Sequence, residues 1–122
     1  MTATLRIVIA EDDALIAMYL EELLQLDGHE VCAIAFSEAE AVAAALRHNP
    51  DLMIVDGSLG QGSGVTAMAA ILDHQPMPHL FVTGDPRNIL AQAPGAVVLT
   101  KPFSLQSLAQ GIDRVLKASR AS

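Results

Sequence analysis

Hydrophobic and polar positions alternate in blocks along the chain. Apolar runs of four to six residues recur at 5–10, 31–35, 52–55, 79–82 and 96–99. Nearly unbroken runs of this length, rich in Val and Ile, are typical of parallel strands that are buried on both faces. The pattern therefore predicts five buried strands.

Between these runs, apolar residues recur at the spacing of amphipathic helices. The first helix is expected over 14–27, with Gly28 ending it. The second begins after Ser37, which forms a capping box with Glu40. The third is expected over about 65–73. The inward faces predicted for the first and third helices are Leu15, Ile16, Tyr19, Leu20, Leu23 and Leu24, and Val65, Met68, Ala69 and Leu72.

The last two predicted helices differ in length. The fifth follows Ser104 as N-cap and carries a long apolar stripe. Only 86–95 is available for the fourth, and Pro94 and Gly95 close it, so at most two turns are expected there. Strand–helix alternation repeated five times predicts an α/β fold, a doubly wound parallel sheet with helices on both faces. We expect one domain over 1–122.

Composition narrows the classes of function. The chain has 14 acidic and 7 basic residues and a net charge of −7, which opposes nucleic-acid binding and a polybasic membrane anchor. No apolar run reaches the roughly 20 residues of a membrane span. The single Cys32 cannot form an internal disulfide, and the N-terminus has no signal-peptide pattern. A cytoplasmic protein without membrane contact is expected.

Polar residues follow four of the five predicted strands. Glu11 and Asp12 follow the first, Asp56 the third, Thr83 the fourth and Lys101 the fifth. Ligands of open parallel sheets bind beyond the carboxyl ends of the strands, so these groups are expected to converge. Crowded carboxylates repel one another unless a cation compensates, and Mg²⁺ prefers such oxygen ligands. A nucleophile, a metal, a cation and a hydroxyl are the parts needed for phosphoryl transfer onto an aspartate.

At this point the sequence resembles the receiver domains of two-component response regulators, over about residues 5–118. The resemblance rests on "VIAEDDALI", "DLMIVD" and "LTKPF". It implies a flavodoxin-like (βα)5 fold with strand order 2-1-3-4-5. Matched position by position, Glu11 and Asp12 are the acidic pair, with Asp12 on the metal. Asp56 is the phosphoacceptor and a metal ligand, and Ser58 would lend its backbone carbonyl to the metal.

Other positions match the same family. Thr83 matches the family's hydroxyl residue, and the small Gly84 after it leaves room for the phosphoryl group. Lys101 matches the lysine that precedes a cis peptide bond to Pro102. Asp13 falls just outside the acidic pair, where it is expected to act only as a helix N-cap.

The resemblance implies a bacterial signalling protein. A sensor histidine kinase or phosphotransfer protein would donate a phosphoryl group to Asp56 in a Mg²⁺-dependent reaction, and hydrolysis would later remove it. The protein would catalyse its own phosphorylation and dephosphorylation and is otherwise no enzyme. Because the fold consumes about 5–118, we expect a stand-alone receiver without an output domain. It would bind a partner, relay phosphate or drain it from a shared kinase.

Two features depart from the family pattern. Val98 stands where many receivers have an aromatic residue whose rotation reports phosphorylation. Gly60 replaces the usual proline, so the glycine-rich loop "LGQGSG" is expected to be mobile.

Residues 78–85 partly resemble a subgroup with the pattern Pro-Phe-x-Phe-Ala-Thr-Gly-Tyr, whose partners include HWE-type kinases. The loop also resembles receivers of the alphaproteobacterial general stress response.

Two other functions stay open on the sequence. The altered fourth-helix region and Val98 are compatible with an interaction module that keeps the fold and never needs phosphate. A flavodoxin-like binder of a nucleotide or flavin phosphate is disfavoured, because the loop after the first strand carries acids that repel phosphate. The histidines have no ligand spacing and are expected to be solvent-facing or incidental; they are His29, His48, His74 and His79.

Overall fold

The computed structural model describes residues 4–121. Strands and helices alternate as the sequence predicts, with one additional small hairpin after the third strand. In chain order the elements are β1 (Arg6–Ala10), α1 (Ala14–Leu26), β2 (Glu30–Ala35), α2 (Glu38–His48), β3 (Leu52–Asp56), β4 (Ser58–Leu59), β5 (Gly62–Ser63), α3 (Gly64–Leu72), β6 (His79–Thr83), α4 (Pro86–Gln92), β7 (Val98–Thr100) and α5 (Leu105–Ala121).

The five strands other than the hairpin strands β4 and β5 form one parallel sheet in the order β2-β1-β3-β6-β7. Numbered without the hairpin strands, this is the expected order 2-1-3-4-5, so the predicted flavodoxin-like fold is confirmed. All five carboxyl ends point to the same edge of the sheet, which is the geometry that gathers the residues following them.

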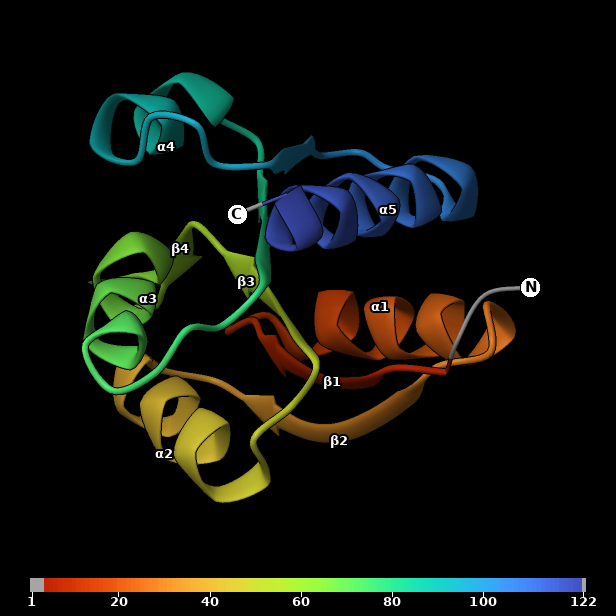
Figure 1. The fold of residues 1–122 in the computed structure, drawn as a ribbon, viewed down its shortest axis with the longest axis horizontal. Coiled ribbons are helices and arrows are strands. Elements are labelled where there is room, and N and C mark those ends of the chain that lie inside the picture. The colour runs from red at the N-terminus through yellow and green to blue at the C-terminus, as the bar shows by residue number, and fades with distance from the viewer. Residues whose placement is uncertain (1–3, 122) are drawn as a thin grey trace.

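Alternate residues of each strand pack into two different hydrophobic cores, one on each face of the sheet. Ile7 and Ile9 of β1 face a core closed by α1 and α5. Val8 and Ala10 face a second core closed by α2, α3 and α4. Figure 1 shows the two layers, with α1 and α5 on one side of the sheet and the other helices opposite. Because both faces are covered, the strands can be apolar throughout.

The predicted helix starts have the expected caps. Asp13 Oδ1 accepts from the Leu15 amide at 2.9 Å, which confirms its role as the N-cap of α1. Ser37 Oγ accepts from the Glu40 amide at 3.1 Å. The fourth helix has only 7 residues, from Pro86 to Gln92, as the early Pro94 and Gly95 imply.

Two predicted helix faces are partly wrong. Leu15 and Tyr19 of α1 are 77% and 46% exposed, although the sequence places them inward. In α3, Ala69 and Leu72 are exposed, whereas Ala67, Met68 and Ile71 are buried. The sheet covers a narrower arc of each helix than the run of apolar residues does, so apolar residues remain at the helix surface.

The prediction that the histidines face solvent or are incidental is wrong for His29. It is buried, and its Nδ1 accepts from the Leu5 amide at 3.1 Å. Its Nε2 lies 3.3 Å from Asp27 Oδ2 but forms no hydrogen bond with it. His29 therefore joins the turn after α1 to the start of β1 and is not a solvent-facing residue.

Candidate functional site

The acidic residues after β1 lie at the carboxyl edge of the sheet. The Glu11 amide donates to Ala35 at the end of β2, at 2.9 Å, and its side chain is buried. Asp12 is exposed. Carboxylate oxygens of Glu11, Asp12 and Asp56 all lie within 4.8 Å of one another. The structure therefore brings together the three predicted metal-ligand carboxylates.

Asp56, the last residue of the central strand β3, is 7% exposed. Its Oδ1 accepts from the Ser58 amide at 3.1 Å. Its Oδ2 pairs with Lys101 Nζ at 3.1 Å. Both carboxylate oxygens are thus held by donors, and the side chain is fixed at the sheet edge.

Lys101 joins two of the acids. Its Nζ lies 3.4 Å from Glu11 Oε1 as well as beside Asp56. Its amide donates to the Thr83 carbonyl at 2.9 Å, which extends the β6–β7 pairing. The peptide bond to Pro102 is cis, as the family resemblance implies. Burial lowers the pKa of Lys101, but the carboxylates of Asp56 and Glu11 more than offset this, and the net shift is upward.

Thr83 ends β6 and is buried at the same edge. Its Oγ1 accepts from the Asp85 amide at 3.0 Å. A hydroxyl that accepts at its oxygen keeps its own hydrogen for donation. A Cβ placed on the following residue, Gly84, would meet no heavy atom within 4 Å, so there is open space at that position.

Glu11 is the most perturbed acid of the site. Burial, followed by the neighbouring Asp56 carboxylate, raises the pKa of Glu11 to about 8. The Asp13 amide, which donates to Glu11 Oε2 at 3.1 Å, and Lys101 oppose this only in part. In the metal-free protein Glu11 therefore keeps its proton near neutral pH, because a further negative charge here lacks enough compensation.

The cluster fits a hard divalent cation. Its donor set consists of carboxylate oxygens, which Mg²⁺ prefers, and the exposure of Asp12 leaves one side of the cluster open to water. A bound cation would supply the positive charge that Glu11 and Asp56 need in order to be ionised together. Ser58 is two residues from Asp56, and the role of its carbonyl as a metal ligand stays a prediction.

Glycines allow the loop after β3 to approach this edge. A Cβ on Gly64 would overlap the Asp56 carbonyl oxygen, so α3 begins directly against the end of β3. A Cβ on Gly57 would come within 2.7 Å of Ile89 Cδ1 of α4. Helices α3 and α4 therefore pack closely onto the segment that carries Asp56.

One carboxylate near this loop is not predicted from the sequence. Glu38, the first residue of α2, accepts from the Ser63 amide at 2.6 Å, across 25 positions of the chain. No motif or spacing in the sequence relates the two residues. The hairpin that contains Ser63 was itself predicted only as a flexible loop.

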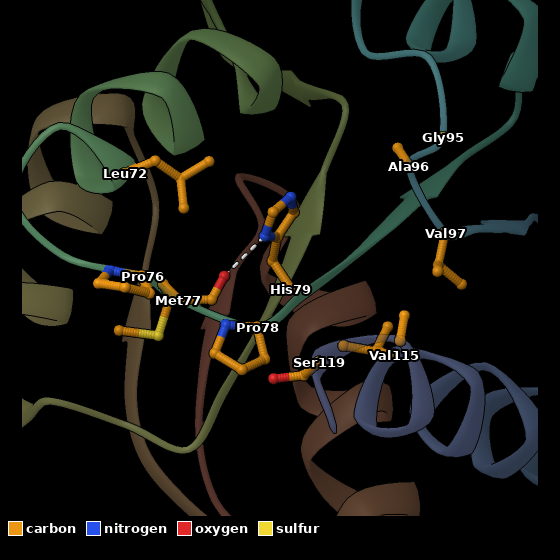
Figure 2. Close-up of a pocket in the computed structure, with 11 residues that line it drawn as sticks. Leu72, Pro76, Met77, Pro78, His79, Gly95, Ala96, Val97, Val115 and Ser119 are labelled. Carbon is orange, nitrogen blue, oxygen red and sulfur yellow. Dashed lines mark hydrogen bonds between the residues drawn. The ribbon is translucent and has the colours of Figure 1, made fainter. Parts of the chain in front are cut away.

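A separate pocket lies at the opposite end of the sheet. Figure 2 shows its apolar lining, which includes Leu72, Met77 and Val97, around His79 at the start of β6. His79 Nδ1 lies 2.8 Å from the Met77 carbonyl oxygen. The pocket, of about 310 Å³, contains none of the predicted site residues. Its position at the amino ends of the strands separates it from the acidic cluster.

Within residues 4–121, no helix has both the length and the apolar character needed to cross a membrane.

The fold and the clustered acids, lysine and threonine define a receiver-like α/β signalling domain. A family model for the response regulator receiver domain matches residues 7–113, so the chain belongs to that family.

Individual relatives agree with this assignment. The chain is 34% identical over 119 residues to the transcriptional regulatory protein PdtaR of Mycobacterium tuberculosis, covering 94% of this chain and 58% of PdtaR. It is 34% identical over 114 residues to the phyllosphere-induced regulator PhyR of Methylorubrum extorquens, covering 90% of this chain and 43% of PhyR. The chain thus spans about half the length of these relatives.

A solved structure shows the same architecture. The response regulator PhyR from Brucella abortus superimposes with a TM-score of 0.88 at 31% identity, covering 98% of this chain and 50% of that one.

Proposed function

We propose that this receiver domain accepts a phosphoryl group on Asp56 from the phosphohistidine of a sensor histidine kinase or phosphotransfer protein. The observation that carries the proposal is the placement of Asp56. A buried strand-end carboxylate lies 3.1 Å from Lys101 Nζ and within 4.8 Å of two further carboxylates. These are the groups that phosphoryl transfer to a carboxylate requires.

In the proposed reaction, an oxygen of Asp56 attacks phosphorus in line with the leaving imidazole. The new O–P bond forms as the P–N bond of phosphohistidine breaks, and the imidazole leaves as the neutral base after taking up a proton. Lys101 then turns its ammonium from the carboxylate to the phosphoryl oxygens. The Thr83 hydroxyl donates to another of these oxygens, because its own oxygen already accepts from Asp85.

Glu11, Asp12, Asp56 and the Ser58 carbonyl would hold Mg²⁺. When bound, the ion would neutralise negative charge on the transferring phosphoryl oxygens. Glu11 supplies its carboxylate only after losing a proton, since burial raises the pKa of Glu11 to about 8. Metal binding is therefore accompanied by proton release below that pH.

The surface next to the site supports docking of a kinase or phosphotransfer partner. Leu15 and Met18 of α1 are 77% and 61% exposed. The same helix also borders a groove of about 350 Å³, lined by Tyr19, Phe103 and Lys101 among others. An exposed apolar face of this kind suits a helical partner. A partner seated here would place its histidine near Asp56, and kinases of the HWE type are our first candidates.

We further propose a single receiver domain over 1–122 in a cytoplasmic protein that signals through protein partners, relays phosphate or acts as a phosphate sink. The receiver family match over 7–113 and the net charge of −7, which disfavours nucleic acid, support this reading.

A phosphorylation-independent interaction module is the second candidate. It is favoured by Val98, a half-buried residue of the edge strand β7 that replaces the usual aromatic residue. A branched aliphatic side chain cannot rotate between buried and exposed positions as an aromatic ring does. Partner binding that is identical for wild type and Asp56→Asn would favour this module.

The first test uses acetyl phosphate, a small phosphodonor that needs no kinase. With Mg²⁺ present, the intact mass of the protein is expected to rise by one phosphate. Asp56→Asn, which removes the nucleophile but keeps the size of the side chain, should show no rise. An unchanged wild-type mass, under conditions that label a control receiver, would contradict the proposal.

A further inference from the structure

The hairpin β4–β5 is tied to the rest of the protein by carboxylates from two other elements. Asp12 Oδ2, from the loop after β1, accepts from the Gly60 amide at the hairpin tip at 2.9 Å. Glu38 Oε2, from the first turn of α2, accepts from the Ser63 amide at 2.6 Å. Bonds of an amide to a charged carboxylate are shorter and stronger than neutral ones. The hairpin is therefore held at both its tip and its returning strand.

Gly62 is required for the second of these contacts. A Cβ at this position would fall on the carboxylate of Glu38. Any larger residue would push the carboxylate away from the Ser63 amide. The glycine thus makes room for Glu38, in addition to any flexibility it adds.

The contact reaches the candidate site through the hairpin pairing. Ser63 pairs with Ser58 across the two short strands. The Ser58 amide in turn donates to Asp56 Oδ1 at 3.1 Å. Leu59, next to Ser58, is buried in the core shared with α2 and α3, which limits movement of the first strand. A continuous path of contacts therefore links Glu38 to the Asp56 carboxylate.

We propose that Glu38 is a positioning residue for the metal and phosphoryl site. By holding the Ser63 amide it sets the hairpin register, and the hairpin then fixes both Ser58 and the amide that holds Asp12. This inference rests on the proposed function, because the ligands it positions are those of the proposed Mg²⁺ site. Partners that orient metal ligands from outside the ligand shell are worth about 10- to 100-fold in metal affinity.

Glu38 also places negative charge at the N-terminus of α2, where the charge interacts favourably with the helix dipole and stabilises the helix. Glu40 provides the matched control for this effect. It carries the same charge in the same turn, but its Oε1 accepts from the Phe36 amide and not from an amide of the hairpin. Glu38→Gln is the conservative variant, because its amide oxygen can still accept from Ser63 without the charge.

The experiment measures the Mg²⁺ dissociation constant by amide chemical-shift titration, together with hydrogen exchange of the Ser63 amide without metal. Glu38→Ala should weaken Mg²⁺ binding about tenfold, at the low end of the range for such partners, and speed exchange at Ser63. Glu38→Gln and Glu40→Ala should stay within about twofold of wild type, since neither removes an acceptor from the hairpin. Gly62→Ala should give the same result as Glu38→Ala. If Glu38→Ala does not fold, Gly62→Ala serves as the test variant in its place.

Several outcomes would overturn the inference. The first is wild-type Mg²⁺ affinity in both Glu38→Ala and Gly62→Ala. The second is a loss of Mg²⁺ affinity in Glu38→Gln or Glu40→Ala as large as that in Glu38→Ala. The third is failure of both Glu38→Ala and Gly62→Ala to fold. Wild-type protein that binds no Mg²⁺ would overturn the proposed metal site and this inference together. Mg²⁺ binding in wild type with no response to the variants would overturn this inference alone.

Discussion

Glu11 is the residue whose ionisation depends most on its position in the fold. Burial and the adjacent Asp56 carboxylate raise the pKa of Glu11 from 4.5 to about 8. Between these values the folded protein holds a proton that the unfolded chain has released. Rising pH in this window therefore favours the unfolded state.

The expected result is a loss of stability of the metal-free protein as pH rises from about 5 to 8, with a slope from Glu11 of at most about 1.4 kcal/mol per pH unit. Urea unfolding in the presence of a chelator, at several pH values, measures it. Glu11→Gln cannot titrate and should lack this part of the slope. Equal pH slopes for the two proteins would show that Glu11 is not perturbed as described.

Gly64 lies where the start of α3 closely approaches the backbone of Asp56. A Cβ on Gly64 would overlap the Asp56 carbonyl oxygen, which is backbone and cannot rotate away. Gly64→Ala should therefore destabilise the fold by about 1–3 kcal/mol or more, as overpacking does. Gly84→Ala, where the same atom meets nothing within 4 Å, should stay within about 0.5 kcal/mol. Urea unfolding of the two variants distinguishes them, and equal losses would refute the packing argument.

At the scale of elements, strands were easier to predict than helix faces. The buried strands read as continuous apolar runs because both faces of the sheet are covered. The helices α1 and α3 carry apolar residues beyond the arc that the sheet covers. Periodicity alone therefore could not separate core residues such as Leu20 from exposed ones such as Leu15.

The hairpin β4–β5 could not be predicted from local pattern. Its strands have two residues each, and it contains glycines that equally suit a loop. Its amides donate to Asp12 and Glu38, which lie 48 and 25 positions away from their partners. Contacts of this range leave no periodic signal in the sequence.

The exposed face of α1 leads to a prediction about partner docking. Leu15→Lys and Met18→Lys introduce charge beside the site, so phosphotransfer from the partner kinase should fall at least about tenfold, as for interface anchors. Labelling by acetyl phosphate and urea stability should be unchanged, because both side chains are exposed. The rate of transfer from each autophosphorylated histidine kinase of the source organism measures the effect.

Leu26→Lys is the matched control for that prediction. Leu26 is 70% exposed and ends α1, at the opposite end from the site. It should transfer at the wild-type rate. Loss of transfer in Leu26→Lys alone, or wild-type transfer in the Leu15 and Met18 variants, would place the partner elsewhere.

In the molecule as a whole, the two ends of the sheet carry different chemical environments. The carboxyl edge gathers the acids, Thr83 and Lys101, and the amino edge carries the apolar pocket of Figure 2. The first grouping could be predicted, since parallel strands bring their ends to one edge whatever the distance in sequence. The pocket could not, because it depends on how loops and the end of α5 pack together.

The proposed function requires that Asp56 is the residue that carries the phosphoryl group. Borohydride reduces an aspartyl phosphate to homoserine, which marks the modified position permanently. After incubation with acetyl phosphate and Mg²⁺, reduction and peptide mass mapping, homoserine is predicted at position 56 and should be absent when Mg²⁺ is chelated. Homoserine at position 12, 13 or another acidic position, with position 56 unmodified, would show that Asp56 is not the phosphoacceptor.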